Sequence, residues 1–160
     1  MTETHQLIQG EFSRKLDDRF RLTLPQEFEK LFSPENGKCV IAKERPGCLS
    51  LWDEMAWTKH DKRIDLVQSK LGAGVLELKM PQLQMFGRLL STRQRELQLA
   101  GRARLVVPEG FREFLGVEPG SDVMVVGAAI CIELWHPKKW FEYIEGEISG
   151  FGALLDTLSQ

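Results

Sequence analysis

The chain contains the same short pattern twice, and this repetition limits the possible folds more than any other feature of the sequence. The segment LDDRFRLTLP (16–25) is followed 83 positions later by LAGRARLVVP (99–108). Average residue usage gives chance matches at roughly one position in fifteen to twenty. At this offset the identical pairs also include Phe28 with Phe111, Cys48 with Cys131, Leu51 with Leu134, Trp52 with Trp135 and Trp57 with Trp140. Since all four tryptophans fall into these pairs, we interpret the chain as a tandem duplication.

The size of the repeated unit bears on how the copies fold. The chain has 160 residues, and each copy covers about fifty residues, a length that buries only a marginal core alone. We therefore expect the two copies to share one core.

Composition and cysteine usage favour a soluble cytoplasmic protein. Hydrophobic residues make up 42% of the chain and charged residues 28%. The longest apolar run (123–132) is about half of what a membrane helix needs, and the first fifteen residues lack the apolar segment of a signal peptide. Cys39, Cys48 and Cys131 have no C-x-x-C spacing, so we expect buried thiols rather than disulfides or a zinc site.

Charge is distributed unevenly along the chain. The net charge is −2, yet residues 86–104 carry five arginines against Glu96 alone, whereas the residues from Glu133 onward are acidic. The first copy of the motif is also slightly basic, so positive charge gathers around both copies. On charge alone, two explanations stay open: solvated faces without a partner, and a surface for an anionic partner.

The hydrophobic pattern of each copy predicts a strand, a short helix and two further strands. Residues 21–24 alternate polar and apolar side chains, as in a half-buried strand. Pro25 suits the first position of a helix, and Phe28, Leu31 and Phe32 then fall on one helical face. Two strands follow in each copy: CVIA and CLSLW in the first, and VMVV and CIELW in the second.

Helices are expected outside these strands. Helices should begin near Asp53 and Pro137, and residues 53 to about 92 are predicted to be helical with a break at 72–74. A second connecting helix should begin at Pro81. The C-terminal tail is also predicted to be helical, and its apolar residues favour self-association.

The sequence offers no catalytic machinery. Asp17 and Asp18 form a carboxylate pair, but the second copy has Ala100 and Gly101 in their place. The three histidines are scattered without metal-ligand spacing, and no glycine-rich phosphate loop follows a strand. We expect neither an enzyme nor a bound cofactor or metal.

Arginines are the remaining candidates for function. Arg19 and Arg21, like Arg102 and Arg104, lie at the entrance of equivalent strands, and a pseudo-twofold axis would bring them onto one surface. Guanidinium groups there could bind phosphates or guanine edges. Arg21 could instead pair with Asp17 as a brace within the turn, and the two roles can coexist.

The segments LDDRFRLTLP, LAGRARLVVPEGFREFLGV, VMVVG, IELWHPKKW and QLQMFGRLLSTRQREL together resemble the MraZ family of bacterial transcriptional regulators. The resemblance covers nearly the whole chain. It implies an α+β fold of two tandem AbrB-like (SpoVT-AbrB) swapped-hairpin β modules that form an intramolecular pseudo-dimer with flanking helices. The expected divisions are module 1 (9–55), a helical connector (56–93), module 2 (94–138) and a helical tail (139–160).

The resemblance also implies a function. It implies a sequence-specific DNA-binding regulator, a repressor in the leading interpretation, of a division and cell-wall gene cluster. Such a protein would be nucleoid-associated and would bind repeated boxes on double-stranded DNA as a homo-oligomer, expected to be a ring, without a membrane. The alternative is an AbrB-fold protein-interaction module of antitoxin type. The candidate DNA-binding residues are Arg14, Lys15, Asp17, Arg19, Arg21, Arg102 and Arg104.

The chain departs from the family motif, D-x-x-x-R with glycine before the arginine. Ala100 replaces the aspartate of the second copy, and Phe20 and Ala103 replace the glycines. A glycine there with positive φ would make both substitutions unfavourable.

Overall fold

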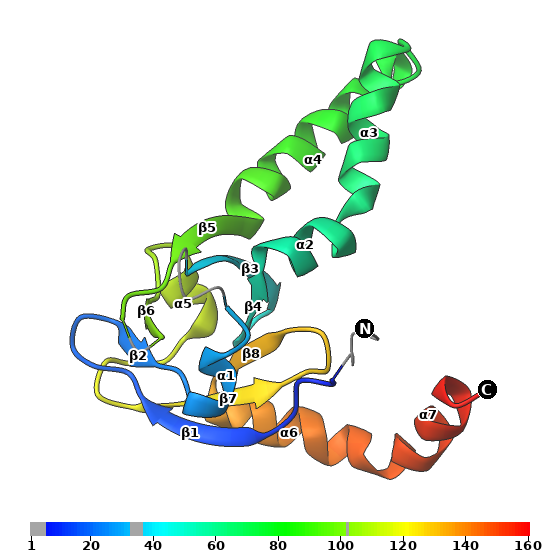
Figure 1. Ribbon diagram of the computed structural model, residues 1–160. Coiled ribbons are helices and arrows are strands. Elements are labelled where there is room, and N and C mark those ends of the chain that lie inside the picture. The colour runs from blue at the N-terminus through cyan, green and yellow to red at the C-terminus, as the bar shows by residue number, and fades with distance from the viewer. Residues whose placement is uncertain (1–5, 33–36, 102) are drawn as a thin grey trace.

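The computed structural model describes residues 6–32, 37–101 and 103–160. Within these residues the fold is α+β, with a six-stranded antiparallel sheet, a separate two-stranded ribbon and several helices (Figure 1). The strands are β1 (Glu11–Lys15), β2 (Arg21–Thr23), β3 (Lys38–Arg45), β4 (Cys48–Asp53), β5 (Gln94–Gln98), β6 (Arg104–Val106), β7 (Asp122–Gly127) and β8 (Ile132–Trp135). The helices are α1 (Gln26–Glu29), α2 (Glu54–His60), α3 (Lys62–Gly72), η1 (Glu77–Lys79), α4 (Met80–Arg93), α5 (Phe111–Leu115), α6 (Pro137–Glu147), η2 (Ile148–Gly150) and α7 (Phe151–Leu158).

Strands from the two copies of the sequence repeat interleave. The order in the large sheet is β1-β7-β8-β4-β3-β5, so β1 pairs with β7, β4 with β8, and β3 with β5. In Figure 1, blue β1 from the start of the chain lies beside yellow β7 from its last third. The main core contains residues of both copies, among them Leu22, Leu105, Phe28 and Phe111. Neither copy could form this core alone.

The small ribbon joins β2 to β6 across the same repeat. Its antiparallel pairs are Arg21 with Val106, Leu22 with Leu105, and Thr23 with Arg104. Leu22 and Leu105 are equivalent residues of the two copies, and each is 1% exposed. The ribbon therefore buries one face through a pair of matched leucines and leaves its other face outside the core.

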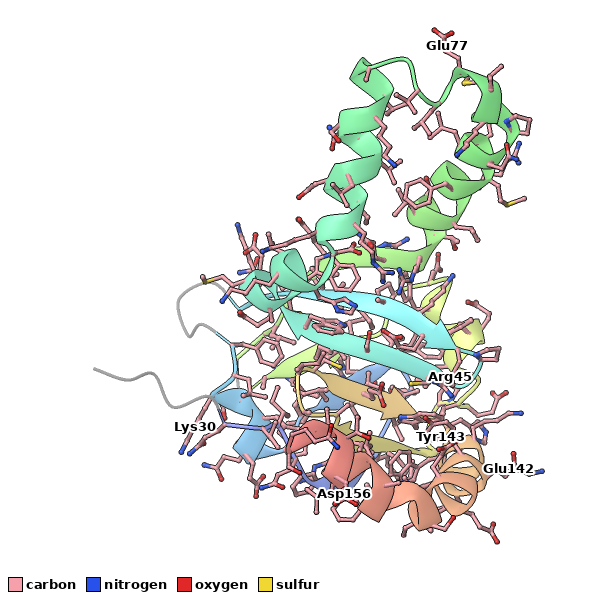
Figure 2. The ribbon with its side chains drawn as sticks, turned by 90° about the vertical axis from the view of Figure 1, so that its right-hand side faces the viewer. Lys30, Arg45, Glu77, Glu142, Tyr143 and Asp156 are labelled. Atoms are coloured by element: carbon pink, nitrogen blue, oxygen red, sulfur yellow. The ribbon has the colours of Figure 1, made fainter. Side chains whose placement is uncertain are left out.

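Two helical elements extend away from the sheet. Helices α3 and α4 form a hairpin arm that projects from the body (Figures 1 and 2) and contains no buried residue. Helix α6 instead packs on the sheet through Trp140, whose Nε1 donates a hydrogen bond to Glu11 Oε2 at 3.1 Å. Helix α7 follows, and all of its residues are exposed. No helix in the described part of the chain has both the length and the apolar character needed to cross a bilayer.

The structure adds strands that the hydrophobic pattern did not predict and moves some helix starts. β1 and β5 precede the expected strand of each copy and form the two edges of the large sheet. Pro25 is the residue before α1 rather than its first residue, and α4 begins at Met80 rather than at Pro81. Helix α6 does begin at Pro137. The prediction of buried, free thiols is confirmed for all three cysteines.

Candidate nucleic-acid interface

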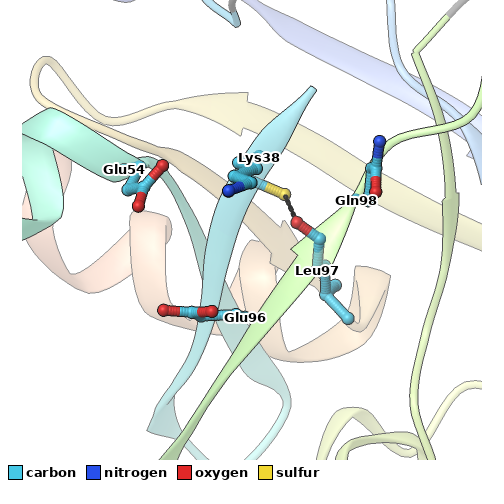
Figure 3. A pocket seen from close by; sticks show the side chains of 6 residues that line it. Lys38, Glu54, Glu96, Leu97 and Gln98 are labelled. Atoms are coloured by element: carbon cyan, nitrogen blue, oxygen red, sulfur yellow. Dashed lines mark hydrogen bonds between the residues drawn. The ribbon is translucent and has the colours of Figure 1, made fainter. Parts of the chain in front are cut away.

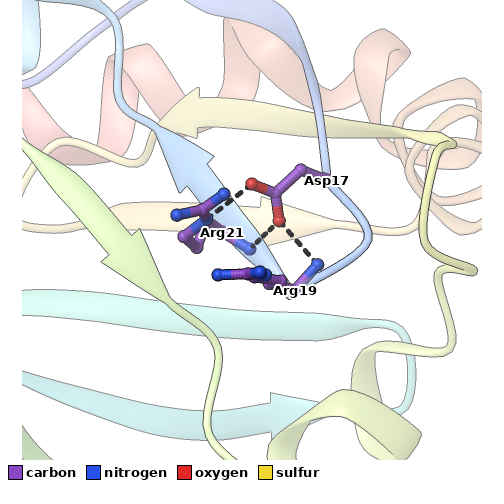
Figure 4. A network of polar contacts seen from close by, with 3 residues as sticks. All are labelled: Asp17, Arg19 and Arg21. Atoms are coloured by element: carbon purple, nitrogen blue, oxygen red, sulfur yellow. Dashed lines mark hydrogen bonds and ion pairs between the residues drawn. The ribbon is translucent and has the colours of Figure 1, made fainter.

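A braced turn precedes β2. Asp17 Oδ1 accepts hydrogen bonds from the backbone N–H groups of Arg19 and Arg21, both at 2.8 Å, and its Oδ2 accepts one from Arg21 Nε at 2.7 Å (Figure 4). The side chains of Arg19 and Arg21 extend in the same direction from this turn (Figure 4). One carboxylate thus fixes both the backbone of the turn and the direction of the Arg21 side chain.

The charge state of Asp17 follows from these contacts. The backbone hydrogen bond from Arg21, followed by the bonds from the Arg21 side chain and the Arg19 backbone, lowers the pKa of Asp17 below its usual 3.8. Asp17 is therefore ionised at neutral pH. The ion pair engages Arg21 Nε and leaves both Nη atoms outside the brace. Arg21 can consequently offer its outer fork to an external acceptor while its inner edge stays fixed.

Among the described residues of the equivalent turn before β6, backbone hydrogen bonds join Ala100 and Arg104. Ala100 N–H donates to the carbonyl of Arg104 at 2.9 Å, and Arg104 N–H donates to the carbonyl of Ala100 at 3.2 Å. Ala100 has no carboxylate with which to orient the Arg104 side chain. Arg102, the counterpart of Arg19, lies outside the described residues.

The ribbon places Arg21 and Arg104 on one face. Successive side chains of a strand alternate between faces, and Leu22 and Leu105 point into the core. The residues on either side of these leucines must therefore lie on the opposite face. Arg104 is exposed, and the Arg21 side chain is 41% exposed. Arg21 and Arg104 are diagonal neighbours in the register, a relation that separates the two positions by about 7–8 Å.

Both positions that replace the motif glycine have left-handed backbone geometry. Phe20 has φ 59° and Ala103 has φ 54°, a region that costs a non-glycine residue about 1–2 kcal/mol. The Phe20 ring lies under the Arg112 guanidinium at 4.2 Å, and Arg112 Nε donates to the carbonyl of Val107 at 2.7 Å. This contact holds the first turn in its strained form, and the small methyl of Ala103 is buried.

The other predicted cations lie on β1, the strand that leads into the braced turn. Arg14 is half-buried, with its guanidinium 5.5 Å from the centre of the Phe12 ring and Nη1 donating to the carbonyl of Ser13. Lys15 is exposed and, as the next residue of the strand, points to the opposite face. The two residues therefore lie on different faces of β1. Of the predicted residues that the structure describes, Asp17, Arg19 and Arg21 meet in the braced turn, and Arg104 shares the ribbon face of Arg21.

Three residues beside these arginines were not among the predicted site residues. Thr23 and Val106 share the exposed face of the ribbon with Arg21 and Arg104, and Arg112 contacts Phe20 from α5. The alternation in β2 and β6 could have identified Thr23 and Val106 as outward-facing. Nothing in the local sequence indicates the contact of Arg112, because it joins positions 92 residues apart.

A small cavity elsewhere offers little chemistry. It has a volume of about 220 Å³ beside β5, and its lining includes Lys38, Cys39, Glu54 and Glu96 (Figure 3). Cys39 Sγ donates to the carbonyl of Leu97 at 3.6 Å. Burial, followed by the charge of Asp53, raises the pKa of Cys39 to about 12, so this thiol is a poor nucleophile at neutral pH. Within the described ranges, no group of three or more acidic, histidine or cysteine side chains could hold a metal ion.

Comparisons with known proteins agree with the resemblance seen in the sequence. The family model described as "MraZ protein, putative antitoxin-like" matches residues 91–152. A protein of Syntrophomonas wolfei named "Transcriptional regulator MraZ" is 28% identical over 150 residues, which is 93% of this chain and 94% of the relative. Proteins of the same name are 26% identical in Thermus thermophilus, over 85% of this chain and 86% of the relative, and 28% identical in Salmonella paratyphi A, over 96% and 95%.

The chain is similar to MraZ proteins over most of its length. The similarity to curated MraZ proteins extends through both copies of the repeat, whereas the family model covers the second copy and part of the tail. These MraZ relatives are named regulators of transcription. Their names agree with the prediction that this chain is not an enzyme.

Proposed function

We propose that this chain is a transcriptional regulator that binds specific double-stranded DNA through the exposed face of the β2–β6 ribbon. The observation that carries the proposal is the position of Arg21 and Arg104 on that one face, with Arg21 oriented by Asp17. A two-stranded ribbon fits the major groove, where arginine recognises guanine O6 and N7. The names of the MraZ relatives support a role in transcription.

We propose that the interleaved strands form an intramolecular pseudo-dimer of two AbrB-like swapped-hairpin modules. The pairing of Leu22 with Leu105, equivalent residues of the two copies, supports a pseudo-twofold axis through the ribbon. Ser50 and Glu133, a second equivalent pair, face each other in the β4–β8 ladder. The proposed divisions are 9–55 and 94–138 for the modules, 56–93 for the connector and 139–160 for the tail.

The proposed contacts differ in kind. Arg21 would read a base edge and Arg104 would attract phosphate, with Arg19 and Arg102 beside them and Asp17 as the brace. Arg14 and Lys15 would contribute general attraction from β1. The net charge of −2 supports a mode of binding in which one chain attracts DNA only weakly.

We further propose that several chains assemble, in a ring, and bind repeated boxes. Helix α7 supports this assembly because Phe151, Leu154, Leu155 and Leu158 are 55–76% exposed. A monomer gains nothing by leaving an apolar helix in water, so a partner surface accounts for its composition. The arm formed by α3 and α4, together with η1 between them, carries further exposed apolar residues, including Leu66 and Leu78.

The target genes and the location in the cell follow from the family resemblance. We propose repression of a bacterial division and cell-wall gene cluster by a cytoplasmic, nucleoid-associated protein. A second candidate function is a protein-interaction module of antitoxin type, which the description of the matching family model favours. A helical tail such as α7 suits self-association better than the extended wrapping of a toxin.

The experiment that tests the proposal is selection of bound fragments from the source organism's genomic DNA, followed by titration. Linking weak sites strengthens binding by roughly 10² to 10⁴-fold without any new contact. A fragment with several copies of the selected motif should therefore bind far more tightly than a fragment with one copy. Failure to enrich any sequence would contradict the proposal, and equal affinity for the two fragments would contradict the role of assembly.

A further inference from the structure

The exposed face of the ribbon carries two side chains besides its arginines. Thr23 is exposed, and Val106 is 49% exposed although it belongs to a strand whose neighbouring Leu105 is 1% exposed. The repeat makes Arg21 equivalent to Arg104 and Thr23 equivalent to Val106. The face thus consists of two arginine positions and two β-branched positions related by the repeat.

Each β-branched residue lies directly across the ribbon from an arginine. Val106 is opposite Arg21, and Thr23 is opposite Arg104. Residues directly opposite in an antiparallel pair have Cβ atoms about 4.5–5.5 Å apart, which is about 1–2 Å more than the rise of about 3.4 Å between stacked bases and lies within the reach of a side chain. A side chain across from a guanine-reading arginine is therefore placed against the neighbouring base pair.

The chemistry of Val106 selects one group in the major groove. Its side chain consists of methyl groups, which neither donate nor accept hydrogen bonds. The apolar group that base edges present in this groove is the C5 methyl of thymine, and apolar side chains read it by contact. Asp17 orients Arg21, and the register places Val106 opposite Arg21, so these two side chains are positioned to read one base step together.

We infer that Val106 is a specificity-determining residue that recognises a thymine methyl next to the guanine bound by Arg21. This inference rests on the proposed function and adds the base step that the first half of the ribbon face reads. Thr23 stands across from Arg104, the arginine without an aspartate brace, and carries a hydroxyl in place of one methyl. Thr23 also has one methyl that can contact thymine, but no carboxylate orients the arginine opposite it, so we assign the fixed methyl contact to Val106.

The test replaces single thymines by deoxyuridine in a duplex selected from genomic DNA, which removes one methyl group and nothing else. For the full-length wild-type chain, one replacement should weaken binding about fourfold, the equivalent of about 0.8 kcal/mol for one buried methyl-sized group. Val106→Ala should bind the thymine and deoxyuridine duplexes equally. Thr23→Ala, the matched control at the equivalent position, should keep the fourfold difference.

Val106→Thr provides a second variant that keeps the β-branched shape preferred in strands. The loss of affinity caused by the deoxyuridine replacement, here called the methyl effect, should be smaller in this variant than in wild type. The inference is overturned if wild type is indifferent to every deoxyuridine replacement, or if Val106→Ala retains the methyl effect. Loss of the effect in Thr23→Ala as well would also overturn it. In all three cases the proposed function would stand if wild type still prefers the selected DNA to a scrambled duplex. If wild type shows no such preference, both the proposed function and this inference are contradicted.

Discussion

The turns before β2 and β6 occupy equivalent places in the fold but hold their arginines differently. In the first turn the Asp17 carboxylate binds two backbone N–H groups and Arg21 Nε. Both turns share the bond from the N–H of residue 17 or 100 to the carbonyl of Arg21 or Arg104, but in the second turn the Arg104 N–H donates to the Ala100 carbonyl instead of to a carboxylate. The duplicated backbone thus survives without the brace, because the ribbon and its buried leucines define the turn. What the second copy lacks is a fixed direction for its arginine side chain.

Separating the two copies should have the largest effect. A fragment of residues 1–60 loses the partners of β1, β2 and β4, which are β7, β6 and β8. We expect the fragment to be unfolded, or to dimerise by pairing with itself, because half of the shared core cannot bury its apolar surface. Circular dichroism and analytical ultracentrifugation distinguish these states. A stable folded monomer would show that each copy is an independent unit.

Removing the brace should reduce discrimination between DNA sequences. In Asp17→Ala the Arg21 side chain must be ordered on binding, at a cost of about 0.5–1.5 kcal/mol. We expect the ratio of affinities for the selected and scrambled duplexes to fall about 2- to 10-fold. Ala100→Asp, the reciprocal variant, should raise the ratio by orienting Arg104. A ratio unaffected by Asp17→Ala would mean that the brace has no part in recognition.

The brace also has a defined pH dependence. The pKa of Asp17 is lowered in the folded chain from 3.8, so the stabilisation by its charged form is fully present above about pH 4. It is lost as the pH falls through the lowered folded value. The free energy of unfolding of wild type should therefore exceed that of Asp17→Asn at neutral pH, and the gap should narrow in acid. Chemical denaturation between pH 7 and pH 3 measures this difference in the free energy of unfolding. A difference that widens in acid would contradict the ion pair.

These contrasts also show what the sequence could reveal about the fold. The offset of 83 residues predicted a shared core and the outward arginines, and the Asp17–Arg21 brace was one of the two roles foreseen for Arg21. β1 and β5 could not be predicted, because β5 (QRELQ) has a single apolar residue, Leu97, and becomes a strand only by pairing with distant β3. Local patterns identify elements that bury a face of their own, whereas edge strands depend on the sheet they join.

The smallest effects concern the left-handed residues. Ala103→Gly relieves about 1–2 kcal/mol of backbone strain but loses a buried methyl and adds freedom to the unfolded chain. Its free energy of unfolding should stay within about 0.5 kcal/mol of wild type. Ala100→Gly, where φ is ordinary, should destabilise by about 0.5–1 kcal/mol. Phe20→Gly should destabilise the fold by about 1 kcal/mol, because it removes the aromatic ring that contacts the Arg112 guanidinium.

These three variants form one series that thermal or chemical denaturation can compare. If Ala103→Gly is as destabilising as Ala100→Gly, then the left-handed backbone of Ala103 carries no strain. The left-handed backbone of Phe20 could then not be treated as strained either.

The most direct test of the account is to titrate Arg21→Ala and Arg104→Ala against the selected duplex and a scrambled one at several salt concentrations. Loss of a bidentate base contact costs about 1–3 kcal/mol of discrimination, and loss of one phosphate contact lowers the salt slope by about one unit. We predict that Arg21→Ala reduces the affinity ratio about 5- to 150-fold, whereas Arg104→Ala weakens binding to both duplexes alike. Equal loss of selectivity in the two variants would contradict the division of labour between the braced and unbraced arginines.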